Sequence, residues 1–229
     1  NEYYEDRLAD NDDDLEFGDS TSLTVDADGK VVGAGYNGEG IANVTDNTVS
    51  RGCSYIQDSD GEWDTATNWL KGTVPSSTNN VFIKAESTIS QNKTINDLEL
   101  ETGSQVDINS GFSLNVEGDI TNNSQFIGEG EVVLSGSANQ ELNGVGEYQN
   151  LRLNNTTGAE VVSSTTIIGL LSVDSGTLTT STNGNITMKC TFEDEPSSGD
   201  PKTTAQVGKI ASGAGITGEL TVERCVPKS

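Results

Sequence analysis

The chain contains 229 residues, of which 32% are hydrophobic and 5% are aromatic, and its formal net charge is −24. The small aromatic fraction predicts a thin, aliphatic core, and the 26 glycines, with no heptad or long helical period, predict a β-rich chain. The charge excludes nucleic acid as a partner, since phosphates would be repelled, and no apolar run approaches the roughly 18 residues of a membrane-spanning helix.

Residues 1–60 are predicted to form a mixed, acidic N-terminal region, which begins with NEYYEDRLADNDDDLEFGD. Within it, SLTVDADGKVVGAG alternates apolar and polar residues on both sides of Asp28-Gly29. Alternation around an Asp-Gly turn signal predicts a β-hairpin.

Two short acidic stretches, one within this region and one at its end, are candidate calcium sites. Their carboxylates are Asp26 and Asp28 in DADG, and Asp58, Asp60 and Glu62 in DSDGE. Alternating carboxylates in a turn can direct oxygens at one hard cation, and the glycine permits the bend. Both stretches lack the distal glutamate of a complete EF-hand loop, so a plain hairpin turn is the competing interpretation. Calcium is the only cofactor that the sequence suggests.

Residues 61–80 are predicted to be a capping segment, because they hold both tryptophans of the chain, Trp63 and Trp69, directly before a regular strand pattern. Two large side chains at this place can plug the end of a thin core, and Pro75 would fix the entry of the chain into the strand NVFIK. The alternative is that the two indoles stack on sugar rings.

Residues 81–229 are predicted to form a β-solenoid. Short alternating strands follow one another with glycines in the gaps, and Leu98, Ile120 and Leu142 lie 22 residues apart, which fits one three-sided coil. The competing fold is a β-sandwich, whose strands recur at similar spacing. The side chains expected to point inward are Leu98, Leu100, Ile108, Leu114, Val116, Ile120, Phe126, Val133 and Leu151.

Several segments together resemble the β-helical repeats of very large surface and adhesin-like proteins of Bacteroidetes, which are commonly exported by the type IX secretion system. The segments are WDTATNWLKGTVPSSTNNVFI, TINDLELETGSQVDINSGFSLNVEGDITNNSQFIGEGEVVLSG, YQNLRLNN, LLSVDSGTLTT and ITGELTVER. The resemblance implies a right-handed parallel β-helix on an extracellular protein, and it supplies no catalytic residues. The acidic region before Trp63 and the cysteine at position 225 depart from the family pattern.

Catalysis is not expected. The chain has no histidine, which excludes histidine-dependent triads, histidine zinc sites and a histidine base. A hydrolase or lyase would have to use carboxylates with Lys or Arg. Four carboxylates of the solenoid, namely Asp107, Glu117, Asp119 and Glu131, are spaced as ordinary solvent-facing strand and turn residues.

An exported protein is expected to oxidise its cysteines. Cys190 and Cys225 are predicted to form a disulfide, because subtracting a protrusion near residues 193–204 leaves about one coil between them, and neighbouring strands lie about 4.8 Å apart. Cys53 would then be unpaired or joined to another chain. The alternative is three reduced, separately buried thiols.

We therefore expect a secreted or cell-surface structural and adhesive module, part of a larger extracellular protein or assembly. Its expected partners are surface glycans or other copies and domains of the parent protein. Because the chain begins at Asn1 without Met and carries no tail signal, we expect a processed product or a fragment. The alternatives are a carbohydrate-active β-helix enzyme and a subunit of a filament or surface layer.

Overall fold

The structure is a computed structural model that describes residues 23–25, 31–33, 54–192 and 201–225. The chain divides into two units, Asn1–Ser54 and Tyr55–Ser229. In the first unit, strands β1 (Leu23–Val25) and β2 (Val31–Gly33) pair antiparallel, with Leu23 opposite Gly33. The predicted hairpin is therefore present, and its turn lies outside the described residues.

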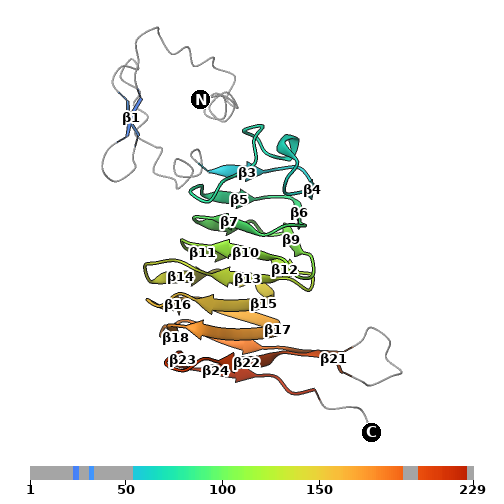
Figure 1. Cartoon of the computed structure of the whole chain (residues 1–229), viewed down its shortest axis with the longest axis vertical. Coiled ribbons are helices and arrows are strands. Elements are labelled where there is room, and N and C mark those ends of the chain that lie inside the picture. Colours follow the sequence, from blue (N-terminus) through green and yellow to red (C-terminus); the bar gives the residue numbers. More distant parts are fainter. Residues whose placement is uncertain (1–22, 26–30, 34–53, 193–200, 226–229) are drawn as a thin grey trace. The chain divides into compact units, whose positions relative to one another are not determined.

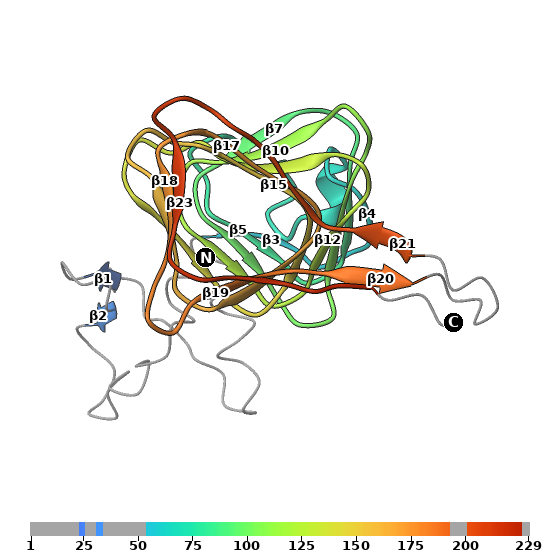
Figure 2. The ribbon, with the colours of Figure 1, turned by 90° about the horizontal axis from the view of Figure 1, so that it is seen from below.

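The second unit is a β-solenoid whose coils stack from β3 to β24 (Figure 1). Seen along the axis from the C-terminal end, β18, β19 and β20 follow one another counterclockwise as the chain approaches the viewer, so the coil is right-handed (Figure 2). Three walls of parallel strands enclose the core. The described part of the chain contains no α-helix. The β-sandwich alternative is wrong, since consecutive coils pair in parallel rather than as antiparallel hairpins.

The first wall is an eight-stranded parallel sheet that receives one short strand from every coil. Its strands are β3 (Tyr55–Gln57), β5 (Val81–Ile83), β8 (Leu98–Leu100), β11 (Ile120–Asn122), β14 (Gln140–Asn143), β16 (Ala159–Val161), β18 (Thr177–Thr180) and β23 (Gly215–Thr217).

The second and third walls belong to one twelve-stranded sheet, because β15 and β17 are long enough to turn the corner between them. The strands of the second wall are β4 (Gly61–Glu62), β6 (Glu86–Ile89), β9 (Gln105–Ile108), β12 (Gln125–Ile127), β15 (Glu147–Asn154), β17 (Ser164–Ser175), β19 (Asn185–Met188) and β24 (Leu220–Val222). The third wall contains β7 (Lys93–Ile95), β10 (Ser113–Val116), β13 (Glu131–Leu134), the later parts of β15 and β17, and β22 (Gln206–Ile210).

The 22-residue spacing is the repeat of the middle coils in the first wall. Ile120 pairs with Leu98 on one side and with Leu142 on the other, so the three aliphatic side chains form one inward column. At the corners the chain turns sharply; at Gly144, where φ is +89°, an added Cβ would lie 2.1 Å from the carbonyl oxygen of Asn122. Only glycine fits this turn, because both the backbone angle and the neighbouring coil exclude a side chain.

The first coil begins earlier than predicted. Strand β3 pairs in parallel with β5, and β4 pairs in parallel with β6, so Tyr55 already lies in the solenoid. The predicted boundaries at residues 60 and 81 therefore place the start too late. Residues 55–62, YIQDSDGE, contain only two apolar side chains, Tyr55 and Ile56, so the apolar pattern becomes visible only at Val81.

The core is mainly aliphatic, as the composition predicted. Eight of the nine side chains expected inward belong to the buried core; Val133 does not, although it is buried. Its register partners are Asn115 and Arg152, which are not core residues, whereas Val132 and Leu134 continue the inward columns. The prediction that Val133 points inward is therefore wrong, because its two neighbours in the run, Val132 and Leu134, take the inward positions.

The core also holds one pair of stacked aromatic rings. The Phe126 and Tyr148 ring centroids are 5.1 Å apart, with an angle of 19° between the ring planes. Both side chains are buried, and they lie on neighbouring strands in register. Burial raises the pKa of the Tyr148 phenol, because the anion would lose its hydration in the core.

Candidate functional site

The N-terminal end of the solenoid is closed by the two tryptophans. Trp63 is 0% exposed and Trp69 is 2% exposed, and their ring centroids lie 4.8 Å apart in an edge-to-face arrangement. The Trp69 Nε1–H donates a hydrogen bond of 2.7 Å to the Trp63 carbonyl oxygen, which fixes the orientation of that indole. Both residues belong to the core cluster, as expected for a plug. Because neither ring offers a face to solvent, the sugar-stacking alternative is wrong.

The same segment also covers the backbone edge of the first coil. The short 3₁₀ turn η2 (Ala66–Asn68) brings Trp69 into an antiparallel bridge with Gln57. The Leu70 N–H donates to the Ile56 carbonyl oxygen at 2.9 Å, and the Asn68 side-chain amide donates to the Glu62 carbonyl oxygen at 3.1 Å. Residues 66–70 thus occupy hydrogen-bonding groups of β3 and β4 that would otherwise be open to another strand.

The candidate calcium ligands near this end do not converge. The Asp60 Oδ1 accepts a hydrogen bond from the Glu86 N–H at 2.8 Å, and the Glu62 Oε2 accepts one from the Ser90 hydroxyl at 2.8 Å. The Asp58 Oδ1 accepts a longer one from the Ser59 hydroxyl, at 3.4 Å. Among the described residues, no group of three or more acidic or thiol ligands is arranged for a metal ion. Asp26 and Asp28 lie outside the described residues.

The carboxylates that a hydrolase or lyase would need are distributed over different walls. Asp107 lies on β9 of the second wall and Glu131 on β13 of the third, where it pairs with Arg152. Glu117 and Asp119 lie at the corner between β10 and β11. The Arg152 guanidinium also lies 3.4 Å from the Asp174 carboxylate. This cation therefore links Glu131 in the coil before its own to Asp174 in the coil after.

A column of side chains at the edge of the first wall links consecutive coils, and the sequence did not predict it. The Asp97 Oδ1 accepts a hydrogen bond from the Asp119 N–H at 2.9 Å, and the Asp119 Oδ1 accepts one from the Glu141 N–H at 2.8 Å. Asn80 begins the column, with a contact of 3.5 Å from the Asp97 N–H to its Oδ1. These side chains replace the water that a turn N–H would otherwise bind, so they are structural groups.

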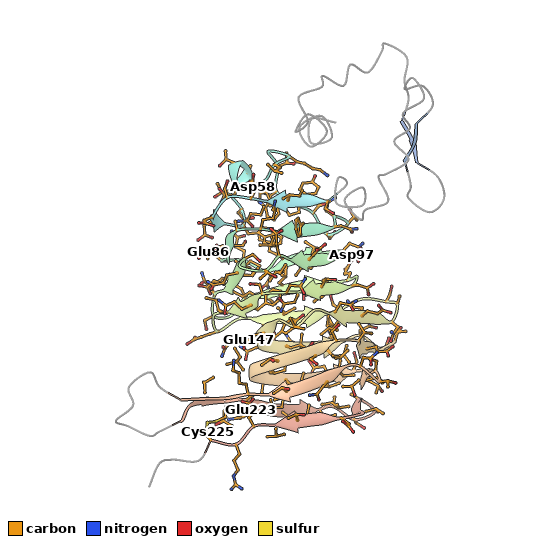
Figure 3. The ribbon with its side chains drawn as sticks, turned by 180° about the vertical axis from the view of Figure 1, so that it is seen from behind. Asp58, Glu86, Asp97, Glu147, Glu223 and Cys225 are labelled. Atoms are coloured by element: carbon orange, nitrogen blue, oxygen red, sulfur yellow. A yellow bond between two sulfur atoms is a disulfide. The ribbon has the colours of Figure 1, made fainter. Side chains whose placement is uncertain are left out.

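Two further carboxylates, Glu86 and Glu147, lie at different heights of the stack (Figure 3). Glu86 and Glu147 are on the opposite edge from Asp97 (Figure 3). Glu147 forms an ion pair with Lys189, and Gln105 and Gln125 stand between Glu86 and Glu147 in the same register column. The Gln125 side-chain amide donates to the Gln105 Oε1 at 2.6 Å. The second wall therefore presents a mixed polar column to solvent.

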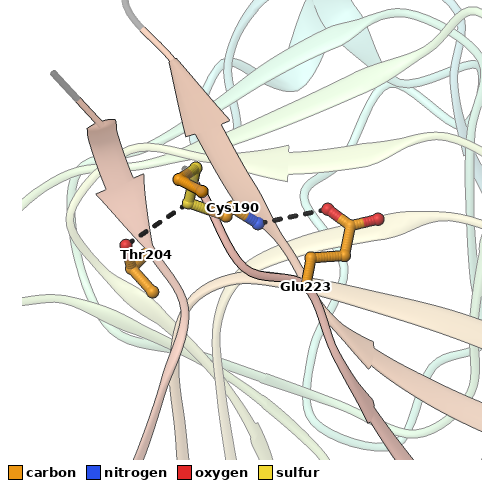
Figure 4. Close-up of a disulfide and its surroundings, with 4 residues drawn as sticks. Cys190, Thr204 and Glu223 are labelled. Carbon is orange, nitrogen blue, oxygen red and sulfur yellow. Dashed lines mark hydrogen bonds between the residues drawn. A yellow bond between two sulfur atoms is a disulfide. The ribbon is translucent and has the colours of Figure 1, made fainter. Parts of the chain in front are cut away.

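The C-terminal part contains the predicted disulfide between Cys190 and Cys225, whose Cα atoms are 5.7 Å apart. Strand β24 pairs with β19, so Cys225 follows one strand and Cys190 follows its neighbour. The Cys190 N–H donates to the Glu223 Oε2 at 3.2 Å, and the Cys190 sulfur lies 3.5 Å from the Thr204 hydroxyl (Figure 4). Cys53 lies outside the described residues.

The predicted protrusion is a two-stranded hairpin beside this disulfide. Strands β20 (Cys190–Phe192) and β21 (Pro201–Thr204) pair antiparallel, apart from both sheets of the solenoid, and they project sideways from it (Figure 2). The disulfide and the hairpin thus fix the last coil to the one before it.

Comparisons with protein-family models, with curated proteins and with solved structures find no match to this chain.

Proposed function

We propose that this chain is a structural and adhesive module of a secreted or cell-surface protein, in which the solenoid serves as a stiff spacer. The observation that supports it is the unbroken first wall. Eight parallel strands run from β3 to β23, and the inward columns between them contain mainly aliphatic side chains, most of them buried. Such a stack resists bending, since any bend must open hydrogen bonds on one wall and compress a close-packed core on another.

The extracellular location is supported by the disulfide. Disulfides persist in oxidising compartments and are rare in the cytosol, and the Cys190–Cys225 pair lies beside an exposed strand rather than in a buried redox site. The resemblance to Bacteroidetes surface proteins favours the same location and export by the type IX system. Among the described residues, no helix is long and apolar enough to cross a bilayer.

The adhesive part of the proposal concerns the outer faces of the walls. Their outward positions carry Thr, Asn, Gln and acidic residues, which suit contacts with surface glycans or with other domains of a longer parent protein. Catalysis is the less favoured function, because Asp119 and Glu131 already hold a backbone N–H and a guanidinium respectively.

Location is tested on intact cells of the source organism. An antibody against the purified chain should label intact cells or detect the chain in the medium, and external protease should remove the surface signal while a cytosolic marker survives. A signal that appears only after the cells are opened would contradict the proposal.

The choice between scaffold and enzyme is tested with the purified chain. It should bind members of a glycan array, and it should release no product from a panel of polysaccharides. Reducing ends or unsaturated products that increase in proportion to the chain concentration would instead support the enzyme alternative. An Asp119→Asn variant with full product release would further exclude that carboxylate as the catalytic group.

A further inference from the structure

The two ends of the solenoid differ. At the N-terminal end, Trp63 and Trp69 cover the core and residues 66–70 cover the strand edges. At the C-terminal end, within the described part of the chain, β23 and β24 stand last in their stacks, and β22 pairs only with β17. The last coil therefore has one paired edge and one open edge on each of its three strands.

The open edge is also apolar. Register shows that the last coil continues the inward columns: Val207 follows Leu171, Ile210 follows Val173, and Val222 follows Met188. Among the described residues no strand stacks beyond them, and these side chains are 41%, 43% and 63% exposed. With the partly buried Ile216 and Leu220 they form what we call the end face, defined as Val207, Ile210, Ile216, Leu220 and Val222.

The backbone of the end face is ready to pair. The Glu223 N–H donates to the Met188 carbonyl oxygen, toward β19. Because backbone groups alternate in direction along a strand, the N–H and C=O groups of Leu220 and Val222 point away from β19, to the open side. Proteins usually protect such edges with charges, proline or a covering segment. At this edge, by contrast, the exposed residues of β22 and β24 include the apolar side chains of Val207, Ile210 and Val222.

We propose that the end face binds the end face of a second copy of this chain, so that two solenoids join tail to tail. The capped N-terminal end excludes the head-to-tail alternative, in which an end face would stack on β3 and β4 of the next copy. Head-to-tail contacts would repeat without limit and form a filament, whereas a tail-to-tail contact is its own partner and closes as a two-fold dimer. The filament alternative is accordingly disfavoured.

Geometry and charge both suit this partner. Two right-handed coils joined tail to tail wind in opposite senses when both are viewed from the same end of the dimer, so facing strands run antiparallel and can form ladder hydrogen bonds. Residues 204–225 contain Lys209, Arg224, Glu219 and Glu223 and no other charged residue, so their net charge is zero in a chain of net charge −24. Lysine or arginine of one copy can lie near glutamate of the other, and this segment itself adds no net repulsion between the two copies.

The test measures the mass of the purified full chain by sedimentation velocity and by light scattering after size exclusion, up to the order of 100 μM. We expect a concentration-dependent species of twice the 24.0 kDa chain mass. Val222→Lys should weaken the association at least about tenfold, because it places a charge in a dry interface. The substitution leaves a lysine in solvent in the monomer, so folding should persist, as circular dichroism would check.

Val145→Lys is the matched control. Val145 is 71% exposed in a turn between β14 and β15, away from the end face, and it receives the same change. It should leave the dimer intact. Amide hydrogen exchange of the unmodified chain provides an independent measurement, in which Leu220 and Val222 should gain protection as concentration rises. A chain that stays monomeric, a dimer that survives Val222→Lys, or protection gained only elsewhere would each overturn the proposal.

Discussion

Replacing Leu114 with aspartate tests the assignment of the core most directly. Leu114 is 0% exposed on β10, and its register neighbours are Lys93 in the coil before and Val132 in the coil after. Removing the leucine side chain alone should cost about 2 to 5 kcal/mol, from lost burial and the cavity left behind. A carboxylate at this place adds several kcal/mol more, since it is buried and the neighbouring Lys93 already pairs with Asp64.

The expected loss approaches the whole stability of an ordinary domain, which is about 5 to 15 kcal/mol. Because each coil contacts only its neighbours, unfolding should begin at β7, β10 and β13 and extend outward. Chemical denaturation followed by circular dichroism measures the loss, and amide hydrogen exchange locates the coils that open.

Asn115→Asp is the control, because it adds the same carboxylate one residue later on the outer face. Its cost should be about 1 kcal/mol, from the lost 3.0 Å hydrogen bond between the Asn115 side-chain amide and the Lys93 carbonyl oxygen. Equal melting of Leu114→Asp and the unmodified chain, or equal losses in the two variants, would show that the inward face of β10 is assigned wrongly.

Three other perturbations have defined outcomes. Trp69→Phe removes the donor to the Trp63 carbonyl oxygen and should cost about 1 to 3 kcal/mol in chemical denaturation, whereas Leu70→Ala, at a 49% exposed side chain, should cost less than about 0.5; equal effects would argue against the cap. Replacing both cysteines, Cys190→Ser with Cys225→Ser, should cost about 2 to 4 kcal/mol and raise hydrogen exchange mainly in β22 to β24; unchanged exchange there would contradict a staple for the last coil. Above the ordinary tyrosine pKa of 10.0, the unfolded chain releases a proton that buried Tyr148 retains, so the free energy of unfolding should fall by up to about 1.4 kcal/mol per pH unit. Tyr148→Phe should abolish that part of the slope in denaturation curves at alkaline pH, and an unaltered slope would place the phenol in solvent.

The sequence predicted the solenoid because alternating aliphatic residues and corner glycines repeat visibly where coils have equal length. Leu98, Ile120 and Leu142 are in register as their 22-residue spacing required. The spacing between register partners is shorter elsewhere: 17 residues from Val81 to Leu98 and 19 from Leu142 to Val161. Corners absorb these differences at little cost, so a fixed period cannot find every coil.

The missed features depend on facts that a one-dimensional pattern does not contain. The phase of Val133 is ambiguous in a run of apolar residues until its neighbours in the adjacent coils are known. The column through Asp97 and Asp119 is invisible among the abundant Asn and Asp residues, because its hydrogen bonds join residues 22 positions apart. The tryptophans were the exception, since the position of two large side chains directly before the first regular strand is visible in the sequence itself.

The disulfide beside the last coil decides how the chain carries mechanical load. Tension applied at the C-terminal end enters through Cys225 and crosses the sulfur bridge directly to Cys190, a sequence separation of 35 residues. The residues between them, which include β21 to β24, lie outside the path of the force. At roughly 3.3 to 3.6 Å per residue, about 115 to 125 Å of extended chain is thereby withheld from any stretch. A pulled solenoid would lengthen by that further amount only in a reducing environment, so the redox state of its surroundings sets its maximum extension.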